Sequence, residues 1–290
     1  MFKVFAFLKR NARLTHDEYR AGHIGYHSGH SRRMKGMRGY CVNVWANRDL
    51  KQALGPLHDR IVRGAPADFL DQWDGFPCVH FDSAATWLAS SEPEKTRAMT
   101  GGLAVDPDRL PDDGPWLFDA VEGTNGQFRS NHVRLEEHVI LPVERTEMKQ
   151  TKLVQFFRRN PALSDDAFRA GVVTRHGPLA ARMKGLNGYI ANFRDRDIDA
   201  AINGFYPPDD WRFTIEGRAT RQAFCNQWDG ASELWFDSLE AFVAARTDPA
   251  IAPELDALEQ HLFEAVWLVE VDESVIVMPN RNPAPEFYYR

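Results

Sequence analysis

The pattern of apolar and polar residues predicts short strands that occur in matching pairs in the two halves of the chain. Both strands of the first pair are apolar on both faces, which is typical of strands that are covered on both sides. Long segments between the second and third strands of each half are expected to be loops. The predicted pairs are residues 2–8 with 152–157, 39–45 with 188–193, 77–82 with 232–237, and segments near 117–121 and 139–141 with segments near 266–271 and 275–277.

The third pair of strands has two different faces. One face is apolar, with Val79 in the first half and Leu234 in the second. The alternate face carries His80 in the first half, and Glu233 and Trp235 in the second. Because successive side chains in a strand point to opposite sides, this second face is expected to look toward a polar space or a ligand.

A period of 3.6 residues predicts a helix between the first and second strands of each half. Thr15 and Glu18 form a capping box at the start of the first helix. Gly177 and Pro178 are expected to break or kink the second helix just after His176. The face of the helix carries Tyr19, His23, Tyr26, His27, His30 and Met34 in the first half, and Phe168, Val172, His176, Leu179 and Met183 in the second.

The two halves of the chain are copies of one unit. Residues 10–43 align with residues 159–192 at a constant offset of 149 without a gap, and 15 of the 34 positions are identical. The motif Gln-Trp-Asp-Gly at residues 72–75 returns at residues 227–230. Each unit has a length that suits a small domain.

The order of elements in each unit is β-α-β-β-α-β. This order predicts an α+β fold class with two ferredoxin-like βαββαβ repeats, at residues 1–148 and at residues 149–290 with a C-terminal tail. Helices would cover one face of each sheet, and the other face is apolar enough to need a second sheet. We therefore expect the two repeats to form a single-chain pseudo-dimeric α+β barrel.

Composition is that of a globular protein and argues against several classes. The chain has 290 residues, of which 43% are hydrophobic and 26% charged. A net charge of −6 argues against nucleic-acid binding, and no apolar run is long enough to span a membrane. Three cysteines without metal-ligand spacing favour a cytoplasmic location. The expected partner is a small hydrophobic substrate, and the expected state is a monomer or a homodimer.

Several motifs resemble the EthD family of the dimeric α+β barrel superfamily. The first half departs from the family pattern, because Ser28-Gly29-His30 follows His27 and because His80 stands where the family has an aromatic residue. Members usually build the barrel from two chains, whereas here one chain would carry both halves. The matching motifs are the opening strand, the helix start Leu-Thr/Ser-x-x-x-Tyr/Phe-Arg, His176-Gly177-Pro178-Leu179, Gly185-Leu186-x-Gly188-Tyr189, and Asp229-Gly230-x-x-Glu233-Leu234-Trp235-Phe236-Asp237-Ser238.

The resemblance implies small, hydrophobic, often aromatic or polyketide-like substrates and cofactor-free decarboxylation, dehydration or oxygenation. Relatives elsewhere in the superfamily bind haem. No Ser-His-Asp, P-loop, GxGxxG or CxxC motif occurs in the sequence. We therefore expect a cofactor-independent lyase-type enzyme that uses acid–base chemistry on a small aromatic or polycyclic substrate. The alternatives are a haem- or metal-dependent oxidase or monooxygenase that uses the first-half histidines, and a non-catalytic binding or accessory barrel.

Histidines and tyrosines at repeated positions are candidate catalytic residues. His27 and His176 share one position at the helix break, where an imidazole can act as a general acid or base or hold the helix end through a free carbonyl. Tyr40 and Tyr189 begin the second strands, where a hydroxyl can donate a proton to a carbonyl or pack at the barrel rim.

The first half holds most of the histidines, so the working site is expected there. Of the ten histidines, eight lie in the first half. His23 corresponds to Val172, and His80 corresponds to Trp235. A polar side chain on an inward face costs stability unless it is satisfied or used. The predicted catalytic residues are His27, His176, His23, His80, Tyr40 and Tyr189, with the centre of the site at His27, His23, His80 and Tyr40.

Residues on the inward strand face are expected to bind the substrate. Asn43 and Asn192 lie on the opposite face from the tyrosines and can donate to an oxyanion or cap a strand end. Glu233 is a further acid–base candidate. No carboxylate stands at a motif position beside the first-half histidines, so no metal site and no cofactor are expected. The predicted substrate-binding residues are Asn43, Trp45, Asn192, Glu233 and Trp235.

Overall fold

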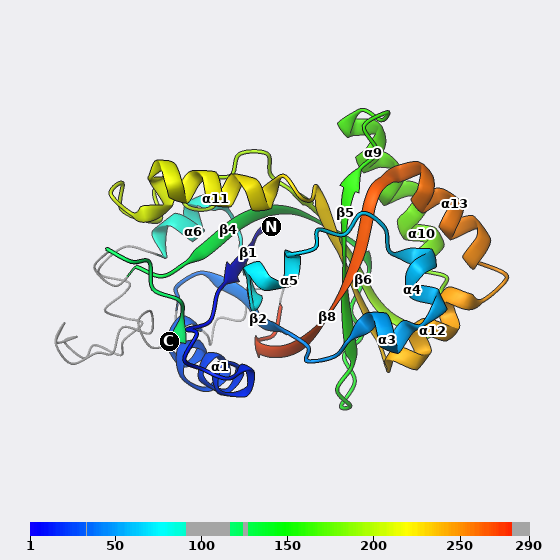
Figure 1. Ribbon diagram of the computed structural model, residues 1–290, viewed down its shortest axis with the longest axis horizontal. Helices are drawn as coiled ribbons and strands as arrows, with labels where there is room; N and C mark the ends of the chain where they lie inside the picture. The colour runs from blue at the N-terminus through cyan, green and yellow to red at the C-terminus, as the bar shows by residue number, and fades with distance from the viewer. Residues whose placement is uncertain (33, 91–116, 124–126, 280–290) are drawn as a thin grey trace.

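Eight antiparallel strands close into one barrel in the computed structural model of this chain (Figure 1). The structure describes residues 1–32, 34–90, 117–123 and 127–279. Around the barrel the strands follow the order β1-β3-β2-β8-β5-β7-β6-β4. The strands are β1 (Phe2–Leu8), β2 (Met37–Trp45), β3 (Gly75–Phe81), β4 (Ser130–Leu141), β5 (Thr151–Arg159), β6 (Leu186–Arg194), β7 (Gly230–Phe236) and β8 (Phe263–Val277).

The fold class predicted from the sequence, two ferredoxin-like βαββαβ repeats forming a pseudo-dimeric α+β barrel, is wrong. The structure is a single closed antiparallel β-barrel, and its described helices are short, with at most 11 residues. The reason lies at the strand edges, because β2 pairs with β8 and β4 pairs with β6. The sheet therefore continues without a break from one half of the chain into the other.

The fourth strand of each half also differs from its prediction. The predicted segments near 139–141 and 266–277 belong to two longer strands, β4 and β8. Residues 117–121 lie outside β4 and make isolated bridges, from Phe118 to Arg10 and from Ala120 to Phe128. Apolar runs mark where these strands lie but not how far each continues through its polar residues.

Helices, rather than loops, occupy much of the long connections between the second and third strands. In Figure 1, α3, α4, α12 and α13 lie on one side of the barrel, while α1 and α6 lie on the other. The helices are α1 (His16–Gly22), η1 (His23–His27), α2 (Ser28–Ser31), α3 (Leu50–Leu54), α4 (Pro56–Ile61), α5 (Phe69–Gln72), α6 (Ala84–Ala89), α9 (Asp165–Gly171), η2 (Val172–His176), α10 (Gly177–Ala180), η3 (Trp211–Phe213), α11 (Ile215–Cys225), α12 (Leu239–Thr247) and α13 (Ala252–Leu262).

In each half, the long connection between the second and third strands packs against the other half. Leu57 and Ile61 of α4 belong to the same apolar cluster as Phe242 of α12. In the opposite direction, Phe205 stacks on Trp87 with ring centroids 3.9 Å apart. Because these contacts bury large apolar side chains, they add to the strand pairing that holds the two halves together.

The first helix of each half changes its hydrogen-bonding pattern at the same place. The capping box of Thr15 and Glu18 predicted for α1 is confirmed. Five residues of π-helix then follow in each half, ending at His27 in η1 and at His176 in η2. The predicted break after His176 is therefore a π-helical turn that leads into α10. Such turns occur frequently at functional sites because they re-aim a side chain.

The barrel interior is filled with aromatic side chains at one end. Phe69 and Trp73 from α5 and its end meet Phe224 and Trp228 from α11 and its end inside the barrel. Phe7 contacts Phe224 at 4.7 Å between ring centroids. Helices α5 and α11 thus close this end, and any open space in the lumen has to lie toward the other end.

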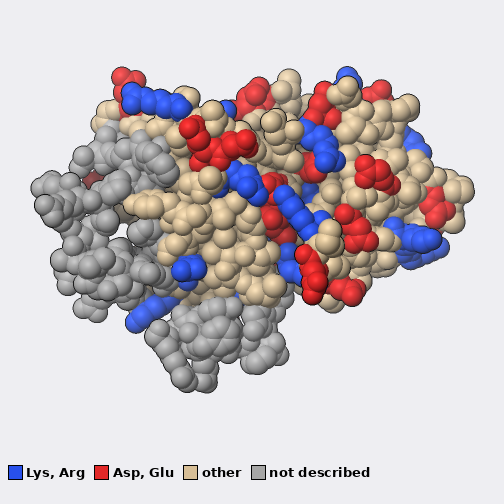
Figure 2. Space-filling view, turned by 90° about the horizontal axis from the view of Figure 1, so that it is seen from below, with Lys and Arg blue, Asp and Glu red and all other residues tan. Residues whose placement is uncertain are grey.

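Charged side chains of both signs are interspersed on the molecular surface seen in Figure 2. A nucleic-acid partner calls for a basic surface, and this face does not offer one. Among the described residues, none of the helices has both the length and the apolar character needed to cross a membrane.

Candidate functional site

A cavity of about 160 Å³ lies between the first-half helices and the outer face of the barrel, and we call it the outer cavity. Tyr40 of β2 and Val79 of β3 point outward from the barrel and form its floor. The remaining lining residues are mainly apolar and aromatic. They are Ala6, Leu8, His27, Ser31, Met34, Pro77, Trp87, Phe118, Phe128, His132, Phe205 and Tyr206.

His27 enters the outer cavity from the last residue of the π-helix. Its Nε2 lies 3.1 Å from the hydroxyl oxygen of Ser31, and its ring meets Phe118 edge-on at 5.0 Å. His23 stands behind it, with ring centroids 5.1 Å apart, and its Nδ1 lies 3.2 Å from the Tyr19 hydroxyl. Burial and the neighbouring His27 hold the pKa of His23 well below its ordinary value. His27 is therefore the imidazole of this pair that a bound molecule would meet.

Two further polar groups face the outer cavity from other elements. The Ser28 hydroxyl donates to the Tyr40 hydroxyl oxygen at 3.3 Å. On the opposite wall, His132 Nε2 lies 3.1 Å from the Tyr206 hydroxyl. Burial, together with the nearby Arg212 and Arg221, lowers the pKa of His132 well below its ordinary value. His132 is therefore uncharged at neutral pH, which suits an apolar cavity.

The corresponding place in the second half is filled. About 10 Å³ of space remains around His176, against about 160 Å³ at the outer cavity. His176 Nδ1 lies 2.9 Å from the Tyr189 hydroxyl, and its Nε2 lies 3.2 Å from Glu259. Gln155 and Arg246 donate to the same Glu259 carboxylate, each at 2.9 Å. His176 and Tyr189 are thus fixed by partners in a packed core.

Acid is expected to weaken this second-half network. Burial would raise the pKa of Glu259, but Arg246 and the hydrogen bonds from His176 and Gln155 lower it to about 2. A depressed carboxyl pKa gives stability that is present above the unfolded value of about 4.3 and is lost as pH falls toward the folded value. At neutral pH the lowered pKa of Glu259 contributes about 3 kcal/mol to the free energy of unfolding.

The test compares Glu259→Gln with the natural protein by urea unfolding at about pH 7 and about pH 3. The natural protein should lose more free energy of unfolding between the two conditions than the variant does. Equal losses in the two proteins would show that Glu259 is not the source of this acid sensitivity.

A second cavity, of about 440 Å³, lies inside the barrel at the end away from the aromatic residues, and we call it the lumen cavity. Its walls carry charged side chains from several strands, together with Cys41, Cys78, His80, Ile190 and Trp235. Its mouth is apolar and is formed by the end of β4 and by the segments that follow β4 and β8. These mouth residues are Val139, Pro142, Val143, Met278 and Pro279.

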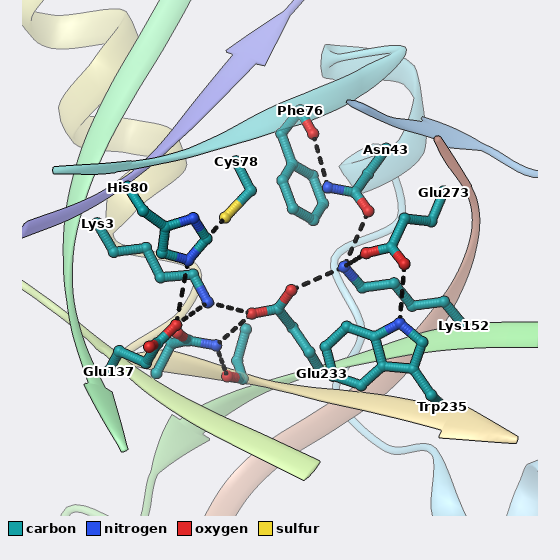
Figure 3. Close-up of polar contacts among 12 residues, drawn as sticks. Lys3, Asn43, Phe76, Cys78, His80, Glu137, Lys152, Glu233, Trp235 and Glu273 are labelled. Carbon is teal, nitrogen blue, oxygen red and sulfur yellow. Dashed lines mark hydrogen bonds and ion pairs between the residues drawn. The ribbon is translucent and has the colours of Figure 1, made fainter. Parts of the chain in front are cut away.

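Glu233 is the centre of a buried network of charges in the lumen cavity (Figure 3). Its carboxylate accepts hydrogen bonds from Lys3, from Lys152 at 2.7 Å and from the Asn192 amide at 3.0 Å. Lys3 also donates to Glu137 at 2.9 Å. Each link crosses between strands, so the network connects β1, β4, β5, β6 and β7.

Lys152 extends this network toward β2 and β8. It donates to Asn43 at 2.9 Å and to Glu273 at 2.8 Å. Glu273 also accepts from Arg145 at 2.6 Å and from the Trp235 indole at 2.9 Å. The Lys152 ammonium lies 4.6 Å from the centre of the Trp235 ring, a cation–π contact.

Mutual attraction keeps the members of the network charged. Burial alone would lower the pKa of Lys3, but Glu137 and Glu233 outweigh it and raise that pKa above its ordinary value. Lys152 behaves in the same way beside Glu233 and Glu273. Burial would raise the pKa of Glu233, whereas the two lysines hold it well below its usual range. Neither lysine is therefore a nucleophile at neutral pH.

The structure separates the residues that the sequence grouped into one site. His27, His23 and Tyr40 lie at the outer cavity, while His80 lies on the other side of the sheet in the lumen cavity, with Nε2 3.3 Å from Glu137. The other predicted residues divide in the same way. His176 and Tyr189 are in the filled second-half core, Asn43, Asn192, Glu233 and Trp235 are in the charged network, and Trp45 packs with the aromatic residues of the lumen.

Residues that sequence reasoning missed complete both cavities. Lys3 and Lys152 are repeat partners at the offset of 149, and this signal was available in the sequence. Glu137 and Glu273 become partners only through the strand register, because Lys3 faces Leu135 while Lys152 faces Val271, an offset of 136. The other missed residues are Arg145 in the lumen cavity, and His132 and Tyr206 in the outer cavity.

The described residues do not fit a metal or haem at the outer cavity. Within the described part of the chain, no group of three or more His, Cys, Asp or Glu side chains is arranged to hold a metal ion. The outer cavity of about 160 Å³ is also smaller than the range of about 300–1,000 Å³ that is usual for drug-sized ligands. A macrocycle such as haem is larger still, so the haem-dependent alternative does not match this cavity.

Comparisons with solved structures found similar chains with low sequence identity. A proposed monooxygenase from Fusobacterium nucleatum subsp. nucleatum has 6% identity and a TM-score of 0.47, with 94% of this chain and 92% of that chain covered. A proposed monooxygenase from Lactobacillus acidophilus has 6% identity and a TM-score of 0.47, with 96% of each chain covered. An anthrone oxidase-like protein has 8% identity and a TM-score of 0.48, with 97% of this chain and 96% of that chain covered.

Comparisons at the level of sequence find one family model that is similar to part of the second half. No curated protein matches the sequence. The EthD domain family matches residues 160–262, a span that runs from the end of β5 through α13. Residues 160–262 are therefore similar to the EthD domain, and the resemblance to the EthD family found in the sequence is confirmed for this part of the chain.

Proposed function

We propose that the chain is an enzyme that transfers protons on a small, largely apolar substrate bound in the outer cavity. The contrast between the two halves carries this proposal. Both halves hold a histidine at the end of a π-helix and a tyrosine at the start of the next strand, but about 160 Å³ of space is left beside His27 and about 10 Å³ beside His176. Only the first-half pair has room for a reacting molecule.

The proposed chemistry uses His27 as the general base and Tyr40 as a hydrogen-bond donor to the oxygen on which charge develops. An imidazole titrates near neutral pH, so it can take and return a proton in one cycle. The aromatic walls, including Phe118, Phe128 and Phe205, suit an aromatic substrate and keep water away from the reacting atoms.

An elimination needs nothing beyond these groups. His27 removes a proton from a substrate carbon, the released electron pair forms a double bond, and the carbon–oxygen bond breaks. The leaving hydroxide takes the proton from the imidazolium and departs as water. An oxidation would begin with the same proton transfer and would then need dioxygen as a co-reactant.

The test follows the shared first step. Small aryl ketones with an acidic carbon–hydrogen bond are incubated with the protein in heavy water, and exchange at that carbon is followed by NMR. The proposal expects exchange above the buffer rate. Dioxygen uptake in step with turnover would identify an oxidase. Loss of water from the substrate without dioxygen uptake would identify a lyase. No exchange and no product for any of the compounds would contradict the proposed enzyme.

A cavity-filling variant tests where the exchange occurs. Ala6 lines the outer cavity, and its repeat partner is Gln155, whose side chain helps to fill the second half. We expect Ala6→Gln to reduce exchange at least about 10-fold while the fold is kept, because the second half tolerates this residue at the same place. Exchange rate and urea midpoint are measured together.

The matched control is Ala120→Gln, the same substitution at an exposed position outside the cavity. It should leave both the exchange rate and the urea midpoint unchanged. Full exchange in a folded Ala6→Gln protein would place the reaction outside the outer cavity.

A further inference from the structure

The lumen cavity is separated from the outer cavity by the sheet, and the proposed proton transfer does not use it. His80 and Glu233 point into the barrel, whereas Tyr40 and Val79 point out of it. At about 440 Å³, the lumen cavity lies within the range usual for small-molecule sites. It is therefore a separate place where a ligand fits.

The two ends of the lumen show that the charged network is not needed to fill the barrel. At one end Phe7, Phe69 and Trp228 pack without a cavity of this size. At the other end buried charges surround open space. Apolar residues would hold a barrel at least as well, because burying charged pairs costs about as much as their attraction returns. Charges kept around a cavity indicate a binding site.

The most exposed of the charges that line the lumen cavity is a cation, Arg145, so the cavity favours an anion. Three cations line it, Lys3, Lys152 and Arg145, against the carboxylates of Glu233 and Glu273. The carboxylate of Glu137 binds Lys3 from beside the cavity. A cationic ligand would come close to the ammonium and guanidinium groups that already lie against the Trp235 ring, at 4.6 Å and 5.8 Å from its centre, and would be repelled.

Arg145 is the group best placed to receive that anion. Its side chain is 22% exposed, whereas the two lysines are 1% exposed. Among the described residues, its one hydrogen bond is from Nη1 to Glu273. A guanidinium carries five N–H donors in a planar fork that matches a carboxylate. Its other donors are thus open to the cavity or to solvent.

The apolar mouth defines the rest of the ligand. Pro142, Val143, Met278 and Pro279 surround the opening, and Trp235 presents an indole ring inside. Such walls suit a flat apolar body, because methionine and tryptophan both pack well against aromatic rings. We propose that the lumen cavity binds a small aromatic carboxylate, with its carboxylate on Arg145 and its ring between Trp235 and the mouth residues.

The test uses 2-naphthoate as the probe and 2-naphthamide as its neutral counterpart, with isothermal titration calorimetry on the full chain. Naphthoate is expected to bind at least about 10-fold more tightly than the amide. Arg145→Gln should remove this preference, and Arg145→Lys should keep part of it because the charge remains. Equal affinity for the two probes, or no binding of naphthoate, would overturn the proposal.

Two further variants locate the binding. Arg158→Gln removes an arginine that pairs with Glu264 on the surface, and it should leave naphthoate binding unchanged. Ile190→Trp adds bulk to the wall of the lumen cavity and should abolish binding, whereas Ala6→Gln in the outer cavity should not affect it. Loss of binding in Ala6→Gln, with Ile190→Trp unaffected, would move the probe to the outer cavity and overturn the assignment. Neither result bears on proton transfer at His27.

Discussion

Replacing Glu233 by glutamine is expected to lower the free energy of unfolding by about 3 kcal/mol. Glu233 is buried between Lys3 and Lys152 and accepts hydrogen bonds from both. Glutamine keeps the size of the side chain but removes the negative charge that the two ammonium groups share. Removing one partner from a buried ion network leaves uncompensated charge in a poorly solvated place, and this costs more than the intact network contributes.

Urea unfolding at neutral pH measures this effect, with Glu136→Gln as the matched control. Glu136 also pairs with a cation, Arg169, but its side chain is 61% exposed. An exposed pair contributes little, so this variant should change the free energy of unfolding by less than about 1 kcal/mol. If the two variants were equally stable, the charges of the lumen would be solvated like surface charges, and Glu233 would not be needed to compensate the two buried lysines.

The positions of the strands could be predicted from the sequence, but the closure of the barrel could not. Residues 2–8 were expected as a strand, and β1 has the same bounds. Alternation also placed Tyr40 and Asn43 on opposite faces of β2, as the structure has them. Closure depends on the pairs β2–β8 and β4–β6, which join residues at least 48 positions apart. The apolar pattern within one half carries no information about such pairings.

Single residues of the candidate site could be predicted from the sequence, but their grouping could not. The sequence does not tell whether a strand residue faces the outer cavity or the lumen cavity. The sequence groups His80 with His27 because the two halves differ at His80, which corresponds to Trp235. In the structure, however, β3 points His80 into the lumen. Lys3 does not stand out as a site residue because it lies inside the apolar run that predicts the first strand. A charged residue inside such a run, repeated as Lys152, is the signal that a buried ion network exists.

The two halves of the chain contribute equally to the lumen cavity but unequally to the outer face of the barrel. In the lumen both halves contribute alike, since Lys3 with Glu137 mirrors Lys152 with Glu273. On the outer face the halves differ, since Ala6 leaves open the space that Gln155 and Glu259 fill in the second half. Both copies of the unit therefore line one lumen with similar residues, whereas their outer faces carry different residues. This difference is the reason to expect unequal roles for the two repeated histidines.

Replacing His27 by alanine is expected to reduce proton transfer by about 10²–10⁴-fold, the range lost when a general base is removed. His27 is half-buried and has the Ser31 hydroxyl as a hydrogen-bond partner, so the free energy of unfolding should fall by about 1 kcal/mol or less. His176→Ala should show the opposite pattern. It removes one buried hydrogen-bond partner from Glu259 and one from the Tyr189 hydroxyl and leaves a gap in the packed core, which together cost about 2–4 kcal/mol of unfolding free energy. The activity per folded molecule should not change.

Exchange in heavy water and urea unfolding, measured on both variants, separate the two roles. His58→Ala serves as the control, because His58 lies on α4 beside Asp59 and away from both cavities. It should change neither quantity. If His27→Ala kept full exchange while a folded His176→Ala lost it, the reacting molecule would have to reach a space of about 10 Å³, and the second half would open during turnover. That outcome would move the active site to the second half and leave the outer cavity without the role proposed for it.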